Sequence, residues 1–363
     1  MKSDKYSPLV SIIVVDYKRK NPYLIECLNA IQKQTYKNYE ILLICDYKVE
    51  NLKYPKLRQK YYGSYVGPAE KRDEGGRLAK GDILAFLDDD AYPSGAWLEH
   101  LVPHFKNESI AGVGGPGVTP PYISWEEEAS GWASASPAGA GPYTYRFLPG
   151  KRQFVDDYPS MNLAVRKTDF KKVSGYDSNY WPGEDTKLCL DLTHYLGKRI
   201  IYEPKAIVYH HRRPILFAHL RQNGNFGLHR GFFARILPKT SLKLVYFLPS
   251  LIFLGFIYMI ITSPLPLYAS TSVETINVTE PFTIYQPIII AKPVINALLV
   301  IRNLGIYCFI LYFLTLSLNA LWVLKKSKKP LHALLSILII FITHLWYGLR
   351  FIQGFLFTGK LTR

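Results

Sequence analysis

Acidic residues are nearly absent from the last third of this 363-residue sequence. Of 28 aspartates and glutamates, only Glu274 and Glu280 follow Arg235, whereas lysines and arginines continue beyond it. Leu, Ile, Phe and Tyr fill the same segment. This composition excludes a soluble nucleic-acid-binding domain despite the net charge of +16, and it predicts membrane helices flanked by cations.

Cysteine is also scarce. The four cysteines, Cys27, Cys45, Cys189 and Cys308, are isolated and include no Cys-x-x-Cys pair. This spacing excludes a disulfide scaffold and gives no metal-ligand pattern. It fits a reducing, cytosolic compartment.

Residues 1–235 alternate short β-branched runs with longer mixed segments, which is typical of an α/β domain with a mostly parallel sheet. The first apolar run, 9–15, is too short for the core of a secretory signal and is expected to be a strand. Residues 119–150 are rich in Pro, Gly, Ser and aromatics, so we expect a mobile functional loop there. The other expected elements are strands at 10–15, 40–45, 83–87 and 111–118, helices at 21–34, 68–79, 96–105, 168–173 and 184–196, and a strand pair or extended segment at 200–209.

Three apolar runs without Asp, Glu, Lys or Arg, the third of which contains two histidines, predict a membrane domain over 236–363. They are 244–262, 304–324 and 331–349, each about long enough to cross a hydrocarbon core of ~30 Å. The aromatic and basic residues at the end of the third run leave an interfacial helix as its alternative.

The lysine cluster at 325–329 sets the expected orientation. By the positive-inside rule it faces the cytosol, which places the domain 1–235 in the cytosol of a plasma-membrane or ER-type membrane protein. Residues 263–286 then lie outside, where Asn277 is a possible glycosylation acceptor. The piece 288–300, broken by Lys292 and Pro293, is expected to be interfacial or re-entrant, because a span there would move the lysines outside.

Aspartates follow three of the predicted strands. Asp16 follows the first and Asp46 the second, and Asp88, Asp89 and Asp90 follow 83–87. Ligands of open α/β sheets bind beyond the carboxyl ends of the strands, although any single aspartate there is equally well a turn or cap residue. Three adjacent carboxylates repel one another unless a cation lies among them, and Mg²⁺ or Mn²⁺ bound to substrate phosphates meets that need. The sequence therefore predicts a site for a metal-chelated nucleoside diphosphate.

Seven motifs, in their order and spacing, resemble family 2 glycosyltransferases of the GT-A fold. That fold is Rossmann-like with a mostly parallel sheet, so the resemblance implies a GT-A catalytic domain followed by an α-helical transmembrane domain. The motifs are VSIIVVDY (10–17), EILLICD (40–46), AEKRDEG (69–75), GDILAFLDDD (81–90), MNLAVR (161–166), GYD (175–177) and GED (183–185).

The resemblance implies roles for individual residues on the donor side. Asp88 and Asp90 match the outer members of the DxD motif, with Asp90 the direct metal ligand and Asp88 facing the ribose or the metal. His211 is favoured slightly over His210 as an additional metal ligand. The further donor-site residues implied by the resemblance are Val15, Tyr17, Asp46, Arg72 and Asp89.

The resemblance also implies a catalytic base, Asp185, in the Gly-Glu-Asp motif at the start of a helix. Inverting transfer needs one carboxylate to take the proton of the acceptor hydroxyl, while an acidic first turn favoured by the helix dipole is the structural alternative. Further residues expected to contact acceptor or pyrophosphate are Asn162, Glu184, His210, Arg212 and Arg213. For the basic residues of this group, a patch that binds anionic lipid headgroups is the alternative.

Residues 215–236 mix His and Arg with Leu and Phe, which predicts an interfacial amphipathic helix that brings a lipid phosphate to the catalytic face. No Gln-x-x-Arg-Trp sequence occurs, which argues against a processive polysaccharide synthase. The leading hypothesis is a metal-dependent inverting enzyme that transfers sugar from a UDP- or GDP-sugar to a polyprenyl-linked glycan. A polyprenyl-phosphate sugar synthase and a nucleotide-binding scaffold of a membrane complex are the alternatives.

Overall fold

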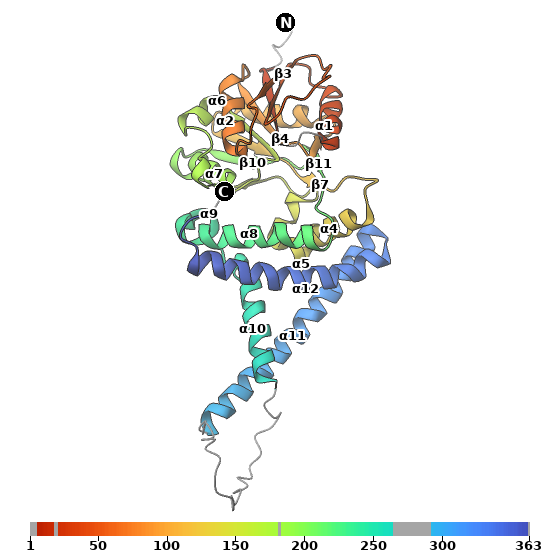
Figure 1. The fold of residues 1–363 in the computed structure, drawn as a ribbon, viewed down its shortest axis with the longest axis vertical. Coiled ribbons are helices and arrows are strands. Elements are labelled where there is room, and N and C mark those ends of the chain that lie inside the picture. Colours follow the sequence, from red (N-terminus) through yellow and green to blue (C-terminus); the bar gives the residue numbers. More distant parts are fainter. Residues whose placement is uncertain (1–5, 18–20, 181–182, 264–291, 362–363) are drawn as a thin grey trace, which may run out of the picture.

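The computed structural model describes residues 6–17, 21–180, 183–263 and 292–361. An eight-stranded, mostly parallel sheet forms the centre of the N-terminal part, in the strand order β3-β2-β1-β4-β9-β6-β10-β8 (Figure 1). Its strands are β1 (Val10–Asp16), β2 (Tyr39–Cys45), β3 (Leu57–Tyr61), β4 (Ile83–Asp88), β6 (Ile110–Gly114), β8 (Gln153–Val155), β9 (Asn162–Arg166) and β10 (Arg199–Tyr202).

Helices cover both faces of this sheet, which explains why its central strands are apolar at nearly every position. Alternate residues of β1 enter different cores: Ile12 packs with α1 and α3, and Ile13 packs on the face that carries α2, α6 and α7. The covering helices are α1 (Pro22–Gln32), α2 (Pro68–Leu78), α3 (Trp97–Leu101), α6 (Lys167–Lys172) and α7 (Glu184–Leu190).

A small second sheet lies beyond the carboxyl end of β4. It joins β5 (Ala91–Pro93), β11 (Val208–His210) and β7 (Gly117–Val118), with β11 in the middle. The expected single strand over 111–118 is thus two strands, β6 and β7, which belong to different sheets.

The segment 119–150 is helical rather than the loop expected from its composition. It forms α4 (Trp125–Ala135), α5 (Pro137–Ala140) and a 3₁₀ helix (Gly141–Arg146). Ser124 and Ser136 begin the two α-helices by accepting hydrogen bonds from backbone N–H groups, as N-cap serines do. Small buried residues such as Ala129 and Ala133 let α4 pack against the C-terminal helices, so a composition typical of loops here serves close helix packing.

The C-terminal region contains three helices long and apolar enough to cross a membrane, within 244–262, 297–327 and 330–357 of the described residues. They correspond to α10 (Leu248–Thr262), α11 (Lys292–Ser327) and α12 (Pro330–Ile352). Residues 292–300 of the piece expected to be interfacial or re-entrant form the first turns of α11, because Pro293 stands where a helix tolerates proline. Their position relative to the membrane stays a prediction. Residues 264–291, which include Asn277, lie outside the described part.

These helices do not all run in the same direction. α10 and α11 extend away from the sheet, whereas α12 lies across them and alongside α8 (Phe217–Ile236), the helix predicted at 215–236 (Figure 1). Glycines of α8 permit this contact: a Cβ on Gly227 would lie 2.6 Å from the Tyr347 carbonyl oxygen, and one on Gly231 would lie 2.1 Å from that of Phe351. The two helices form one layer between the sheet domain and the α10–α11 stem.

Candidate active site

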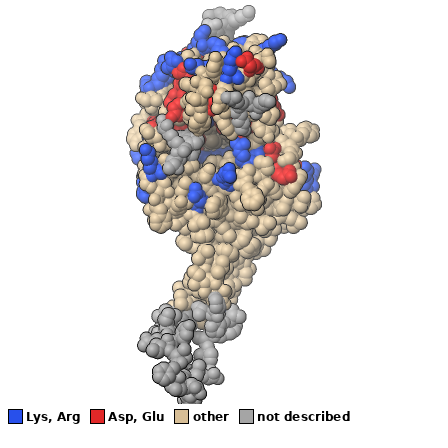
Figure 2. All heavy atoms as spheres, in the orientation of Figure 1, with Lys and Arg blue, Asp and Glu red and all other residues tan. Residues whose placement is uncertain are grey.

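A cavity of about 740 Å³ lies between the carboxyl ends of the strands and the α8–α12 layer, on a face that is visibly hollowed in Figure 2. All site residues predicted from the sequence line it except Asp46 and Asn162. Its sheet side carries charged groups, and its helix side includes Phe226, Ile340, Thr343 and Tyr347. The cavity therefore connects the predicted donor site with the membrane-proximal helices.

Three potential metal ligands meet at the sheet side. One ligand atom each of Asp88, Asp90 and His210 lies within 4.8 Å of the others, which fits a divalent cation bound by carboxylates and an imidazole. The antiparallel pairing of β11 with β5 places His210 opposite Ala91, next to Asp90. His210 Nε2 lies 3.2 Å from Asp90 Oδ1.

His211, which the sequence slightly favoured as the metal ligand, has other partners. Its Nε2 lies 2.8 Å from Glu26 Oε2 and its ring stacks on Tyr23 at 4.0 Å. Neighbouring side chains of a strand point to opposite faces, so only one of the two histidines can face Asp90. The structure assigns that place to His210.

Arg72 joins the two acidic parts of the site. Its guanidinium lies 2.8 Å from Asp88 Oδ1 and 2.7 Å from Glu184 Oε1. Burial opposes its charge, but Asp88 and Glu184 outweigh burial and raise the pKa of Arg72. Arg72 thus orients a predicted metal ligand and the first turn of α7 together.

Asp46 lies beneath the cavity rather than at its wall. It is 1 % exposed and forms an ion pair of 2.8 Å with Lys71, which does line the cavity. The expected role of Asp46 in binding the donor nucleotide therefore stays a prediction, and the structure places Lys71 between Asp46 and the cavity. Val15 and Tyr17 also line the cavity, as Lys71 does. This position is compatible with their predicted roles in donor binding, which stay predictions.

The middle aspartate of the triplet takes part in a buried cluster behind the site. Asn21 Nδ2 donates hydrogen bonds to Asp89 and Asp16. Burial and then the hydrogen bond with Asp16 raise the pKa of Asp89 to about 9. The raised pKa favours the neutral form of Asp89, which suits the hydrogen bonds that it shares with Asn21 and Asp16.

Asp185 lies at the start of α7 and lines the cavity. Burial, and then the charges of Glu184 and Asp157, raise the pKa of Asp185 to about 7. One of its oxygens accepts a hydrogen bond from the Thr186 N–H at 2.8 Å. A carboxylate with a pKa near neutrality is the kind of group that can take up a proton during a reaction.

Asn162 does not belong to the site, contrary to expectation. Its side chain is fully buried, accepts a hydrogen bond from the Trp97 indole at 2.9 Å and donates to the carbonyls of Pro116 and Ala206. These three bonds occupy the amide and tie β9 to α3 and to the segments that precede β7 and β11.

Arg212 and Arg213 do reach the site. Arg213 lies 3.0 Å from Asp90 Oδ2. Arg212 lies 3.2 Å from His210 Nδ1 and over the Phe147 ring, and burial lowers its pKa to about 10. Both cations line the cavity next to the carboxylates.

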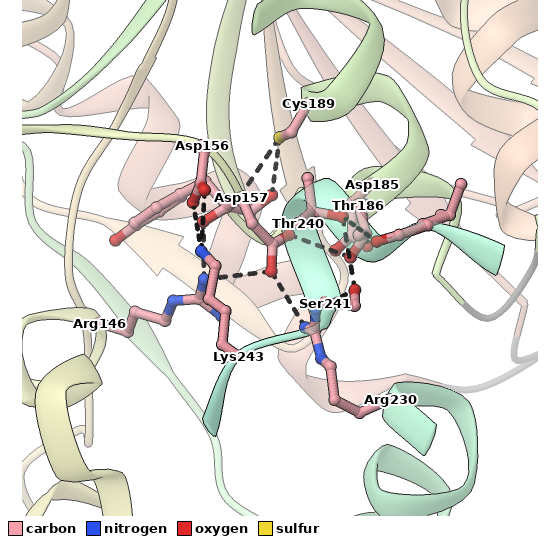
Figure 3. Close-up of polar contacts among 12 residues, drawn as sticks. Arg146, Asp156, Asp157, Asp185, Thr186, Cys189, Arg230, Thr240, Ser241 and Lys243 are labelled. Atoms are coloured by element: carbon pink, nitrogen blue, oxygen red, sulfur yellow. Dashed lines mark hydrogen bonds and ion pairs between the residues drawn. The ribbon is translucent and has the colours of Figure 1, made fainter. Parts of the chain in front are cut away.

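A second charged group on the cavity wall was missed in the sequence. Figure 3 shows Arg146 and Arg230 converging on Asp157, with Thr186 on its other side. Arg146 ends the 3₁₀ helix that follows α5, and Arg230 comes from α8. Segments far apart in the sequence meet here, so no local motif could have revealed the group.

Comparisons with known proteins agree with this geometry. Residues 11–172 match the model of glycosyl transferase family 2. A pre-mycofactocin glycosyltransferase of Mycobacterium tuberculosis is 33% identical over 147 residues, 40% of this chain but only 30% of that protein. A glucosyl-dolichyl phosphate glucuronosyltransferase of Haloferax volcanii is 23% identical over 224 residues, 55% of this chain and 68% of that protein.

Among solved structures, one similarity is to another glycosyltransferase. It is a mannosyltransferase from Pyrobaculum calidifontis in complex with GDP-Man and Mn²⁺, with a TM-score of 0.46 at 18% identity over 63% of this chain and 65% of the other. The sheet of this chain is mostly parallel and covered by helices, as expected from the sequence for a GT-A fold. Residues 11–172 therefore match a family 2 glycosyltransferase domain, and the apolar helices that follow in the chain fit a transmembrane segment.

Proposed function

We propose that this protein is a membrane-bound inverting glycosyltransferase that moves a sugar from a UDP- or GDP-sugar to a lipid-linked, polyprenyl-type glycan acceptor. One observation carries the proposal: a single cavity is lined by Asp88, Asp90 and Asp185 at the sheet and by apolar residues of α8 and α12 at the other end. A water-soluble donor and a lipid acceptor can meet in such a cavity.

The donor end suits a nucleoside diphosphate. Asp88, Asp90 and His210 would hold Mn²⁺ or Mg²⁺, and the metal would neutralise negative charge on the leaving diphosphate. Arg213 and Arg212 lie on the same wall and can bind phosphate oxygens through charge-assisted hydrogen bonds.

The transfer step needs a base on the acceptor side. Asp185 takes the proton from the acceptor hydroxyl as that oxygen attacks the anomeric carbon and the diphosphate leaves from the opposite face. Its raised pKa, about 7, lets it accept a proton more readily than an ordinary aspartate. Arg72, bound to Glu184, holds the first turn of α7 in place.

For the membrane, the proposal is that α10 and α11 span it while α12 lies in its interface. Both ends of the α12 region contact the sheet domain or α8. Lys329 Nζ lies 2.5 Å from Glu128 Oε2 of α4, and Leu361 packs with Leu190 and Phe233. A helix of 23 residues is about 35 Å long, so if it crossed the bilayer one of its ends would be on the far side. On the face drawn in Figure 2 the stem shows no blue or red atoms and the charged side chains lie above it, while Arg302 of α11 is buried.

A polyprenyl-phosphate sugar synthase remains the second candidate, because a phosphate oxygen could enter the same cavity as acceptor. The relative from Haloferax volcanii, whose name gives a sugar on dolichyl phosphate as acceptor, favours the extension of a lipid-linked sugar. Mild acid distinguishes the products, since it releases a single sugar from a polyprenyl monophosphate.

The test is a donor screen with the full chain in detergent, Mn²⁺ and extracted membrane lipids. Release of UDP or GDP that depends on lipid, with a lipid-linked product lengthened by one sugar, is expected. Asp185→Asn should abolish it. A scaffold without activity is favoured if no nucleotide sugar is consumed and the variant behaves like the wild type in cells.

A further inference from the structure

The pair of arginines on the α8 side of the cavity has more charge than its partner neutralises. Arg230 Nη2 lies 3.0 Å from Asp157 Oδ2, and Arg146 Nη2 lies 3.4 Å from the same oxygen. Two guanidiniums thus share one carboxylate whose side chain is only 4 % exposed. The third basic group nearby, Lys243, is neutralised by Asp156 at 2.8 Å, so among these five side chains one positive charge is in excess. The next carboxyl along the wall, Asp185, has a pKa raised to about 7 and neutralises this excess only where it is ionised.

The state of Asp157 keeps this excess in place. Burial alone would raise its pKa, but Arg230 and Arg146 outweigh burial and lower the pKa of Asp157 to about 2. His229 of α8 also lines the cavity, and burial, then the charges of Arg350 and Arg230, lower its pKa to about 4, so it is neutral. An excess cation in a partly buried place is unfavourable unless an anion accompanies it.

The surroundings of the pair are shaped for an amphiphile. Arg230 lies 4.7 Å from the centre of the Tyr246 ring, and Arg146 lies 4.7 Å from that of Tyr143. These two rings stack on each other at 5.6 Å. From there the cavity continues along Tyr347 and Ile340 of α12, which offers an apolar path towards the layer that faces the stem.

The pair is also close to the proposed base. Asp157 accepts a hydrogen bond from Thr186 Oγ1 at 3.0 Å, and Thr186 directly follows Asp185. An anion on the arginines is therefore held on the same side of the cavity as Asp185 (Figure 3).

The geometry points to Arg146 and Arg230 as the binding site for the phosphate group of the acceptor lipid, with the isoprenoid chain lying along α8 and α12. This inference rests on the proposed function and names the acceptor end of that site. The donor diphosphate has separate cations: Arg213 lies at Asp90 and Arg212 next to His210, whereas Arg146 and Arg230 lie at Asp157.

Binding of a short-chain isoprenyl monophosphate to the full chain in nanodiscs of uncharged lipid tests it, with the corresponding isoprenyl alcohol and inorganic phosphate as comparison ligands. Arg230→Gln leaves Arg146 and Asp157 as a neutral pair, so the variant should fold. We expect it to weaken phosphate binding by roughly tenfold or more, since a charge-assisted contact is lost, and to leave alcohol binding unchanged. Arg146→Gln should act alike, and Arg230→Lys should restore part of the affinity.

Arg221→Gln is the matched control, because Arg221 lies on the same helix, is exposed and does not line the cavity. An equal loss in this control would overturn the site and indicate general attraction of charge. Inorganic phosphate binding as tightly as the isoprenyl phosphate would overturn the lipid assignment. If the Arg230→Gln variant transfers sugar with the same acceptor KM as the wild type, the phosphate subsite is overturned but the proposed function is not. If the wild type binds isoprenyl phosphate but transfers no sugar from any nucleotide sugar, the proposed function alone is refuted.

Discussion

The Nε2 atom of His210 lies 3.2 Å from Oδ1 of Asp90. This contact follows from the register of two short strands, since β11 pairs with β5 so that His210 faces Ala91. A shift by one residue would turn His211 towards the carboxylates instead. The composition of the metal site thus depends on a strand pairing within a three-stranded sheet.

Replacing the two histidines separately tests this arrangement. His210→Ala should weaken Mn²⁺ binding in the presence of UDP or GDP by about 10- to 100-fold, the range seen when a metal site loses a supporting group. His211→Ala, which removes a contact to Glu26, should leave the affinity nearly unchanged. Calorimetry or Mn²⁺ EPR measures both, and the reverse order of effects would return the ligand role to His211.

Asp185→Asn should separate activity from stability. We expect kcat to fall by about 10²- to 10⁴-fold, the usual loss for a general base, with donor binding unchanged. Burial raises the pKa of the Asp185 carboxyl to about 7 in the folded protein, so ionisation of this group costs more in the folded than in the unfolded state. The fold therefore loses stability as the pH rises from the pKa of an aspartate in the unfolded chain to about 7, and the full loss is present above pH 7. The variant should therefore have a higher Tm than the wild type at pH 8 and an equal one near pH 4. Asp191→Asn, just beyond the same helix, is the control and should keep full kcat.

The rate should depend on pH through the same group. Burial and the negative charges of Glu184 and Asp157 raise the pKa of Asp185, while Arg72 and the Thr186 N–H lower it. The combined effect is a pKa of about 7. Log kcat/KM is expected to rise by about one per pH unit below pH 7, as the carboxylate forms, and to level off above it. Donor affinity measured over the same range is the control. A flat profile between pH 5.5 and 8 would contradict a base with this pKa.

The placement of α12 in the interface predicts where the end of the described chain lies. A cysteine at Lys360 and one at Glu108, in a background with Cys308→Ala, should react with an impermeant maleimide from the same side of sealed vesicles. The other cysteines, Cys27, Cys45 and Cys189, are buried and should not react. Reaction from opposite sides would support three spans.

The close contact of α8 and α12 depends on glycine. Gly231→Ala would place a Cβ 2.1 Å from the Phe351 carbonyl oxygen, so the helices must separate. We expect a lower Tm, although alanine favours an isolated helix by up to about 1 kcal/mol. Gly305→Ala in α11 is the control, because its Cβ would lie 3.7 Å from the nearest neighbour, Met259. Its Tm should be unchanged or raised.

The sequence alone determined the elements whose pattern is local. β1, β2 and β4 are continuous apolar runs that end in aspartates, and the apolar helices stand out by length and lack of acid. Such features depend only on residues close in the sequence, so they can be predicted without knowing the fold. The helices within 119–150 could not be predicted in this way, because the small residues that permit helix packing also give the composition typical of a loop.

Only the tertiary structure decided which residues act together. It placed Asn162 in a saturated hydrogen-bond network, put Lys71 between Asp46 and the cavity, selected His210 over His211, and brought Arg146 and Arg230 to one carboxylate. It also laid α12 alongside α8 (Figure 1). The physical reason is that strand register, side-chain direction and contacts between distant segments are set by packing across the whole chain, which a local pattern of residue types does not record.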